Sequence, residues 1–371
     1  MPAKKIVVTD VVASSSQGGR PRQEDRFYAR TRIPVGGSGS GSASSSSSSS
    51  LSSTVSFFGI WDGTVCPLAA DYVHSRCCSH HLNAPSFRAV VDRLLLLDRE
   101  RDGVDVDVAG GEELGEALRS VVNEAYASTD ADLLAECRRL GNHYSSTTSV
   151  TAIVAGGLVA IGNLGDSPLF LVRRRGSGSG GGGTRGGGGA ALTGSQVTTD
   201  HKPDQPAERA RIESSGGSVQ YLHRHNYKPF IRGGDFDRRK ATGESAMQLQ
   251  YSRAFGGKDL KPYGLSATPS VAIVPLDGLE GMILCSDGIS DVASPDDAAS
   301  IVASAWSRGE DAAARLVSWG VSRRAAIGMD ADNCTAMVVS FGYEGGGGGE
   351  GEGASSSLLL QSADFPGNCT Q

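Results

Sequence analysis

The sequence lacks the features that mark a membrane-spanning or a disulfide-rich secreted protein. No apolar run approaches the roughly 20 residues that are needed to cross a bilayer. The first ten residues, MPAKKIVVTD, have no long apolar core ahead of a small-residue cleavage site. The seven cysteines are odd in number and follow no spacing pattern. We therefore expect reduced thiols, no membrane partner, and a cytoplasmic or nuclear location.

The chain also has no concentrated basic arm. Its formal net charge is −6, which argues against nucleic acid as a partner. With 371 residues, of which 39% are hydrophobic and 20% charged, the chain has the composition of a globular protein that can bury a substantial core. We expect it to be monomeric.

Three low-complexity tracts interrupt the chain. Residues 36–54 are almost all Gly and Ser, residues 176–190 are mostly Gly, and residues 344–353 are Gly and Glu. Such tracts bury no apolar surface, so we expect them to be disordered. Because motifs lie on both sides of the first two, the sequence predicts one large domain over 1–343 with two insertions, followed by a flexible tail over 344–371.

The ordered part contains many short strands and a few helices. Helices are predicted at 68–82, 112–140 and 296–306, the last with Ser294 as N-cap and Pro295 at its first position. Helices that cluster between groups of strands indicate an α+β fold. Segments that are β-branched or alternating, and bounded by Gly, Ser or Pro, predict strands at 5–12, 25–31, 55–61, 147–154, 157–162, 169–173, 271–275, 282–285 and 334–341.

Two apolar runs end in Asp-Gly. VSFFGIWDGT at 55–64 presents Asp62 and Gly63, and MILCSDG at 282–288 presents Asp287, with Asp291 shortly after. Carboxylates at the ends of rigid strands suit a hard cation that prefers oxygen ligands. A single Asp-Gly is also typical of an ordinary turn after a strand.

Further acids lie at predicted turns and strand ends. GRPRQEDR at 19–26 contains Arg20, Glu24 and Asp25, NLGDS at 163–167 contains Asp166, and DADNCT at 330–335 contains Asp332. Taken alone, each of these acids is more typical of an Asx turn or a solvated charge.

The order of these motifs resembles that of type 2C protein phosphatases, the metal-dependent serine/threonine class. The resemblance runs from about residue 19 to residue 341. It is carried by R-x-x-x-E-D, the strand with Asp-Gly, G-D-S, T-x-D-H-K-P at 198–203, S-R-A at 252–254, S-D-G-x-x-D-V at 286–292 and D-N at 332–333. It implies two packed antiparallel β-sheets flanked by helices, an α-β-β-α sandwich, and hydrolysis of phosphoserine and phosphothreonine in phosphorylated proteins during signalling.

The resemblance also implies roles for the acids. Asp62 would bridge two metals, Asp25 and the carbonyl of Gly63 would serve one, and Asp287 and Asp332 the other. Asp166 and Asp291 match a third, weaker metal site. Glu24 would hold metal-bound water, and Arg20 would grip the substrate phosphate. Oxygen ligands without cysteine or histidine favour Mg²⁺ or Mn²⁺, and the planar fork of arginine suits phosphate.

The sequence departs from the family pattern after Gly63. The family usually continues His-Gly-Gly, with the histidine as proton donor, whereas Thr64, Val65 and Cys66 stand here. The alternative to an active phosphatase is therefore a phosphatase-fold binding module with weak or no catalysis. A further prediction concerns the variable segment before S-R-A, where we expect Arg238, Arg239 and Lys240 to help bind acidic phosphopeptides; a solvated loop is the alternative.

Overall fold

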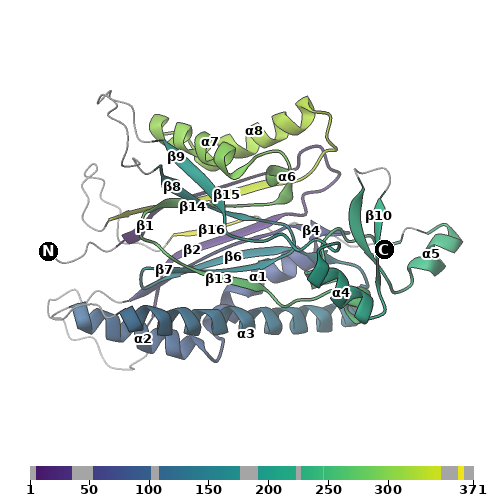
Figure 1. The fold of residues 1–371 in the computed structure, drawn as a ribbon, viewed down its shortest axis with the longest axis horizontal. Helices are drawn as coiled ribbons and strands as arrows, with labels where there is room; N and C mark the ends of the chain where they lie inside the picture. The colour runs from purple at the N-terminus through teal and green to yellow at the C-terminus, as the bar shows by residue number, and fades with distance from the viewer. Residues whose placement is uncertain are drawn as a thin grey trace.

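Two antiparallel β-sheets lie face to face at the centre of the protein (Figure 1). This computed structural model describes residues 6–35, 53–101, 108–175, 191–222, 227–244, 246–343 and 358–362. Within these residues one sheet has the strand order β1-β15-β14-β8-β9 and the other the order β13-β7-β6-β3-β2-β16. Neighbouring strands in both sheets pair antiparallel.

Successive side chains of a strand point to opposite faces of its sheet, so a strand with apolar residues at both sets of positions can be buried on both faces. In β3, Phe57 and Trp61 face the helices, whereas Phe58 and Ile60 face the other sheet. The strands of the first sheet are β1 (Ile6–Ser16), β8 (Leu169–Arg174), β9 (Leu192–Gln196), β14 (Leu279–Cys285) and β15 (Cys334–Tyr343). Those of the second are β2 (Arg26–Pro34), β3 (Thr54–Trp61), β6 (Ser149–Ala155), β7 (Leu158–Leu164), β13 (Ser270–Pro275) and β16 (Leu359–Gln361).

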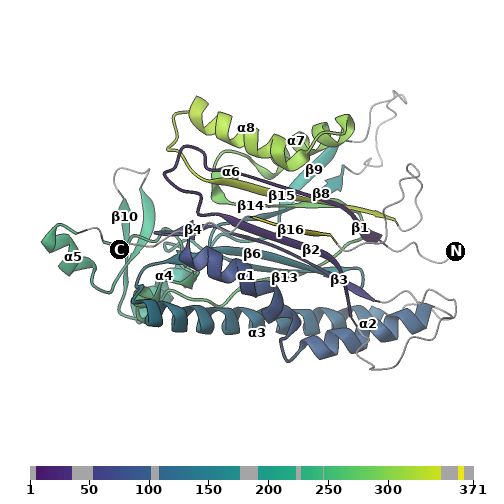
Figure 2. The same cartoon turned by 180° about the vertical axis from the view of Figure 1, so that it is seen from behind.

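Helices cover the outer face of each sheet (Figures 1 and 2). The second sheet is covered by α1 (Leu68–Leu82), α2 (Phe87–Arg101) and α3 (Val108–Leu140), and the first by α7 (Pro295–Arg308) and α8 (Ala312–Ala326). The Ser294 side chain accepts a hydrogen bond from the amide of Asp297 in a capping box, as the sequence predicts for the start of α7. The α-β-β-α sandwich is confirmed.

Smaller elements gather at one end of the sandwich, where Figure 1 shows β4, α6 and β10. We call β10, β11 and α5 the flap. The elements at this end are β4 (Gly63–Thr64), β5 (Ser146–Thr147), β12 (Phe255–Gly256), α4 (Pro206–Ser214), β10 (Ser218–Leu222), β11 (Lys228–Arg232), α5 (Phe236–Thr242), η1 (Lys258–Tyr263) and α6 (Asp287–Ser290).

Two expectations are corrected by the structure. Residues 358–362 are not a free tail, because β16 pairs with the edge strand β2, with Leu359 opposite Arg30. The reduced-thiol prediction is wrong for Cys66, which is disulfide-bonded, although Cys77, Cys78, Cys137, Cys285 and Cys334 are free.

The predicted disordered tracts lie mostly outside the described residues, at 36–52, 176–190 and 344–357, while Thr54 already begins β3. In the described part of the chain, no helix is both long enough and apolar enough to cross a membrane.

Candidate metal centre

The predicted acids converge because antiparallel strands begin and end at a common edge. Asp25 directly precedes β2 and Asp62 directly follows β3, and these neighbouring strands pair Arg26 with Trp61. In the other sheet, Asp287 follows β14 and Asp332 precedes β15, which pair Cys285 with Ala336. Both sheets therefore deliver carboxylates to the same end of the sandwich.

Asp25 is the most enclosed of these acids. The residue is 1% exposed, and its Oδ2 accepts a hydrogen bond of 2.9 Å from Ser286 Oγ. Its Oδ1 has no hydrogen-bond partner in the described part of the chain. Burial raises the pKa of Asp25 to about 6, and the nearby charge of Asp332 adds to the effect. A buried carboxylate oxygen without a donor is suited to a cation.

Hydrogen bonds to its backbone carbonyl fix the position of Asp62. Its carbonyl oxygen accepts hydrogen bonds from the Thr148 amide at 3.0 Å and from Thr147 Oγ1 at 2.8 Å. Burial, followed by the charges of Asp25 and Asp287, raises the pKa of Asp62 well above its usual range.

Asp287 shows the same shift. Burial and then the charge of Asp166 raise its pKa well above normal. The described residues place no cationic side chain within ion-pair distance of Asp25, Asp62 or Asp287. We call these three residues the inner acids. The charge of Lys202 lowers the pKa of Asp287, but burial and the neighbouring acids outweigh it. The negative charge of the inner acids therefore fits a divalent cation bound through oxygen.

The inner acids do not form a closed cage by themselves. Among the described residues, no three carboxylate, imidazole or thiol groups are gathered tightly enough to hold one ion. Burial is the largest cause of the raised pKa of Asp62 and of Asp287, and the charges of neighbouring acids add to it. The predicted ligand set also includes the Gly63 carbonyl, which is not one of these groups.

Asp166 and Asp291 differ from the inner acids, because each pairs with a cation. Asp166 is buried and its Oδ2 contacts Lys202 Nζ. Asp291 Oδ2 lies 3.2 Å from Lys228 Nζ and 3.6 Å from Arg324 Nη1. We call Asp166 and Asp291 the outer acids. They line a hollow of about 470 Å³ together with Lys202 and Asp287.

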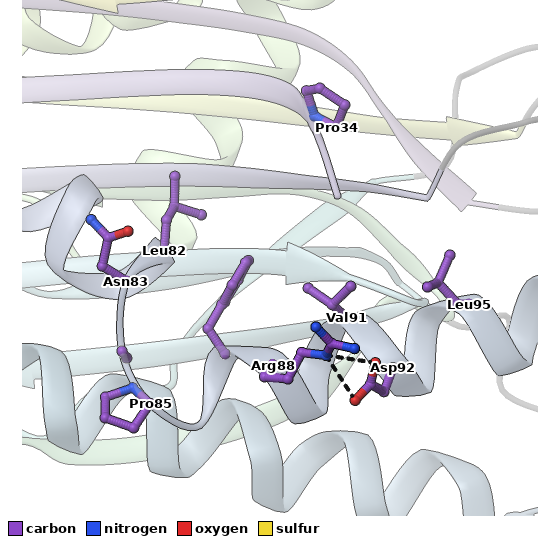
Figure 3. Close-up of a pocket in the computed structure, with 10 residues that line it drawn as sticks. Pro34, Leu82, Asn83, Pro85, Arg88, Val91, Asp92 and Leu95 are labelled. Atoms are coloured by element: carbon purple, nitrogen blue, oxygen red, sulfur yellow. Dashed lines mark hydrogen bonds and ion pairs between the residues drawn. The ribbon is translucent and has the colours of Figure 1, made fainter. Parts of the chain in front are cut away.

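Another hollow, of about 720 Å³, lies between α1, α2 and the end of β2 (Figure 3). Its charged residues Arg88 and Asp92 pair with each other at 2.9 Å, and none of the predicted acids lines it. Although this hollow is larger than the one beside the outer acids, it has no predicted metal ligand, and we do not take it as the reaction site.

Arg20 lies at the edge of the centre. Its side chain is 52% exposed, and its Nη2 lies 2.9 Å from Asp332 Oδ1. Its loop is fastened by Asn333, whose Nδ2 donates to the carbonyl oxygens of Gln17 at 3.0 Å and Arg22 at 2.9 Å. The sequence shows the Asp-Asn pair but not this supporting role of Asn333.

Glu24 lies in the same loop. Its amide donates to Asn333 Oδ1 at 2.8 Å, and burial raises the pKa of its carboxyl although Arg20 and Arg22 oppose the shift. Gly63 packs beneath it, since a Cβ added at Gly63 would lie 2.7 Å from the Glu24 carbonyl oxygen. Only glycine fits this close approach.

The departure from the family pattern lies in β4 and the turn that follows. Thr64 pairs with Ser146 of β5. Val65 has a φ of 78° and is 54% exposed, so a β-branched residue stands in the left-handed region that favours glycine. The structure thus explains why a glycine suits the second position after Gly63.

The D-H-K-P and S-R-A motifs form hydrogen bonds and ion pairs near the acids without being predicted metal ligands. His201 Nδ1 accepts a hydrogen bond of 3.1 Å from the amide of Gly165, next to Asp166, and burial lowers the pKa of His201 to about 4. Glu208 is buried and receives Arg253 Nη2 at 2.7 Å and Arg211 Nη2 at 2.7 Å. The D-H-K-P and S-R-A motifs therefore position the strands and loops that carry the acids.

The flap residues that we predicted to bind substrate are partly engaged within the flap. Arg238 and Arg239 contact Asp235 Oδ2 at 2.6 Å and 2.9 Å, and Asp235 also accepts from the hydroxyl of Tyr144 at 2.7 Å. Arg239 lies 4.4 Å above the ring of Tyr144. The substrate-binding role of Arg238, Arg239 and Lys240 stays a prediction, and residues 223–226 lie outside the described part.

Comparison with known proteins decides the family. The family model described as Protein phosphatase 2C matches residues 37–327. The chain belongs to the protein phosphatase 2C family. It is accordingly a serine/threonine protein phosphatase by family, and dependence on Mg²⁺ or Mn²⁺ is general among protein phosphatases 2C.

Relatives with similar sequences come from plants. "Probable protein phosphatase 2C 69" of Arabidopsis thaliana is 30% identical over 330 residues, covering 88% of this chain and 69% of that protein. "Probable protein phosphatase 2C 48" of Oryza sativa subsp. japonica is 35% identical over 256 residues, which is 66% of this chain and 67% of that protein.

Solved structures agree with this assignment. The serine-threonine phosphatase 2C from Toxoplasma gondii has a TM-score of 0.74 and 36% identity, and covers 92% of this phosphatase and all of that chain. A C. elegans sex determining protein, with 18% identity and a TM-score of 0.57 over 90% of this chain and 65% of that one, shares the fold.

Proposed function

We propose that this phosphatase hydrolyses phosphoserine and phosphothreonine in proteins with a water activated at the inner acids. The observation that carries the proposal is the group of Asp25, Asp62 and Asp287, which is buried or half-buried and has no cationic partner among the described residues. When bound, two Mg²⁺ or Mn²⁺ ions would supply a nucleophilic water near neutral pH and neutralise the phosphate oxygens.

The residues divide this task according to their positions. Asp62 lies among the other acids and would contact both ions, Asp25 and the carbonyl of Gly63 would hold one, and Asp287 and Asp332 the other. Glu24 would orient water through its carboxyl, which shares a loop with Asp25. Arg20 is exposed at the edge, where its guanidinium can bind two oxygens of an incoming phosphate together.

A second candidate function is a phosphatase-fold binding module that turns over slowly. It is favoured by Thr64, whose hydroxyl is too weak an acid near pH 7 to protonate a serine or threonine leaving group. The intact set of acids favours catalysis, because a pure binding module gains no stability from mutually repelling buried carboxylates.

Phosphate release from a phosphothreonine peptide, measured with and without Mn²⁺, tests the proposal. We expect release that requires Mn²⁺ and that is lost in Asp62→Asn. Turnover by Asp62→Asn at the wild-type rate with saturating Mn²⁺ would reject the assignment of the inner acids. Peptide binding without any release, from a wild-type protein that also binds Mn²⁺, would establish the binding module instead.

A further inference from the structure

The outer acids are each neutralised by a lysine of the chain itself. Lys202 Nζ contacts Asp166 Oδ2, with 29% and 6% of the two side chains exposed. Lys228 Nζ lies 3.2 Å from Asp291 Oδ2, with 37% and 22% exposed. Arg324 adds a guanidinium 3.6 Å from the same oxygen of Asp291. The outer pair of carboxylates is thus surrounded by three positive charges.

This balance contrasts with that of the inner acids. A divalent ion placed between Asp166 and Asp291 would have to displace both ammonium groups from their carboxylates. Lys202 is largely enclosed, so its displaced ammonium would remain near the ion and repel it. The outer pair therefore does not fit the third ion that the family resemblance implies.

The two lysines come from different parts of the fold. Lys202 belongs to the D-H-K-P segment, whereas Lys228 is the first residue of β11 in the flap. Elsewhere the flap is held by the Ile231 amide, which donates to the Leu249 carbonyl oxygen at 3.0 Å, and by Asp235, which accepts from Tyr144. The ion pair of Lys228 with Asp291 thus links the start of β11 to the end of the sandwich where the acids lie.

We propose that Lys202 and Lys228 occupy the outer acid pair in place of a third divalent ion, and that Lys228 thereby fixes the flap beside the inner acids. The proposal rests on the proposed function, because it takes the inner acids as the site of two ions. Metal sites and flap position are coupled by this arrangement, since any cation drawn to Asp291 competes with the flap for the same oxygen.

Counting bound Mn²⁺ tests the first half of the proposal. The free ion is followed by its EPR signal during titration of the full-length protein. We expect two ions in the wild type and a third in the double variant Lys202→Met, Lys228→Met. Lys258→Met is the matched control, since Lys258 pairs with Asp259 and not with a predicted metal ligand, and it should bind two.

Three ions in the wild type, with no change in the double variant, would overturn the proposal. Asp62→Asn separates this failure from failure of the proposed function. If the inner acids hold the two ions, Asp62→Asn binds fewer than two whatever the lysines do. If Asp62→Asn leaves the count unchanged, the assignment of the inner acids is wrong.

Hydrogen exchange of β11 tests the second half, and it needs only Lys228→Met. This substitution removes a partly exposed ammonium group and leaves the Lys202–Asp166 pair intact. Pro229 has no amide proton, so the measurement uses the other four residues of β11. We expect the amides of Lys228, Phe230, Ile231 and Arg232 to exchange about two- to fivefold faster than in the wild type, the range for loss of a partly exposed ion pair. The control Lys258→Met should leave them unchanged. Equal protection in Lys228→Met and the wild type would show that Lys228 does not hold the flap.

Discussion

Arg20 donates from its Nε to Oδ1 of Asp332 at 3.0 Å, so the arginine expected to bind phosphate contacts a predicted metal ligand. Arg324 Nη2 lies 3.5 Å from the other oxygen of the same carboxylate. If Asp332 held a cation, as the sequence predicts, its hydrogen bond to Arg20 would weaken and the guanidinium would be free to bind a substrate phosphate. The predicted metal site and the predicted phosphate site would therefore share one carboxylate.

The first prediction follows from this contact. Arg20→Gln should lower kcat/KM for a phosphothreonine peptide by about 10- to 100-fold, the value of one or two charge-assisted hydrogen bonds of roughly 1.5–3 kcal/mol. Steady-state kinetics at saturating Mn²⁺ measure it. Arg22→Gln, in the same loop, is the control and should change kcat/KM far less. Equal losses in the two variants would mean that general positive charge, not Arg20, matters.

The second prediction concerns the pH dependence of stability without metal. The folded pKa of Asp62 is raised, so the ionised carboxylate destabilises the fold at high pH, and this penalty disappears as pH falls through the folded pKa. In chelator, Asp62→Asn should therefore have a higher Tm than the wild type at pH 8.

The gap between the two proteins should narrow toward pH 5. Burial also lowers the pKa of His81 and of His201 to about 4, which costs stability over the same range as pH falls. Because both proteins contain these histidines, the difference in Tm isolates the carboxylate. A Tm of Asp62→Asn below that of the wild type at pH 8 would contradict the repulsion described here. Saturating Mn²⁺ should reverse the order.

The third prediction concerns the strained turn after β4. Val65→Gly should stabilise the fold by about 1 kcal/mol, because a β-branched residue with positive φ costs roughly 1–2 kcal/mol while glycine loses some chain entropy. Denaturant unfolding measures it. Val219→Gly, in a strand of the flap, is the control and should destabilise. Loss of stability in both variants would show that the turn carries no strain.

The fourth prediction concerns flap charge. Arg239 contacts Asp235 and the ring of Tyr144. Among the described residues, the one side-chain contact found for Lys240 is a distant one, 5.9 Å from the centroid of the Phe236 ring. Lys240→Glu should raise KM for acidic phosphopeptides, more at low than at high salt, and spare p-nitrophenyl phosphate. Arg239→Glu should in addition lower Tm. Equal changes of KM for both substrates in Lys240→Glu would rule out charge steering.

The sequence predicts the strands and the acids at their ends because both depend on local patterns. β3 has apolar residues on both faces, and Asp62 follows the strand directly. The position of Asp62 at the end of a strand can therefore be predicted without knowing any long-range contact. The ion pairs of Asp166 and Asp291 could not be predicted in this way, because Lys202 and Lys228 lie far along the chain and reach the acids only through the folded topology.

The missed elements have a similar cause. The run Leu94–Leu97 in α2 obscures the helical period, so α2 was not predicted. β16 is a short edge strand that follows a Gly-rich tract, and only its register against β2 identifies it. Departures from the family pattern are visible in the sequence, yet the positive φ of Val65 requires coordinates.

The last prediction asks whether Thr64 disables this phosphatase or only narrows its substrates. A general acid contributes roughly 10²- to 10⁴-fold when the leaving group is poor, and serine or threonine alkoxide is poor. An aryl phosphate leaves without that help. We therefore expect Mn²⁺-dependent hydrolysis of p-nitrophenyl phosphate and a disproportionately low rate on phosphothreonine peptides.

Thr64→His should raise the peptide rate more than the aryl rate. Thr64 lies in β4, where it pairs with Ser146, and it is two residues after Asp62. An imidazole at this position therefore starts from backbone next to the predicted bridging acid. Thr64→Asn, of similar polarity but without a titrating proton near pH 7, is the control and should not raise the peptide rate. If histidine changes neither rate in an active enzyme, the proton reaches the leaving oxygen from another group, and the departure at Thr64 has no catalytic cost.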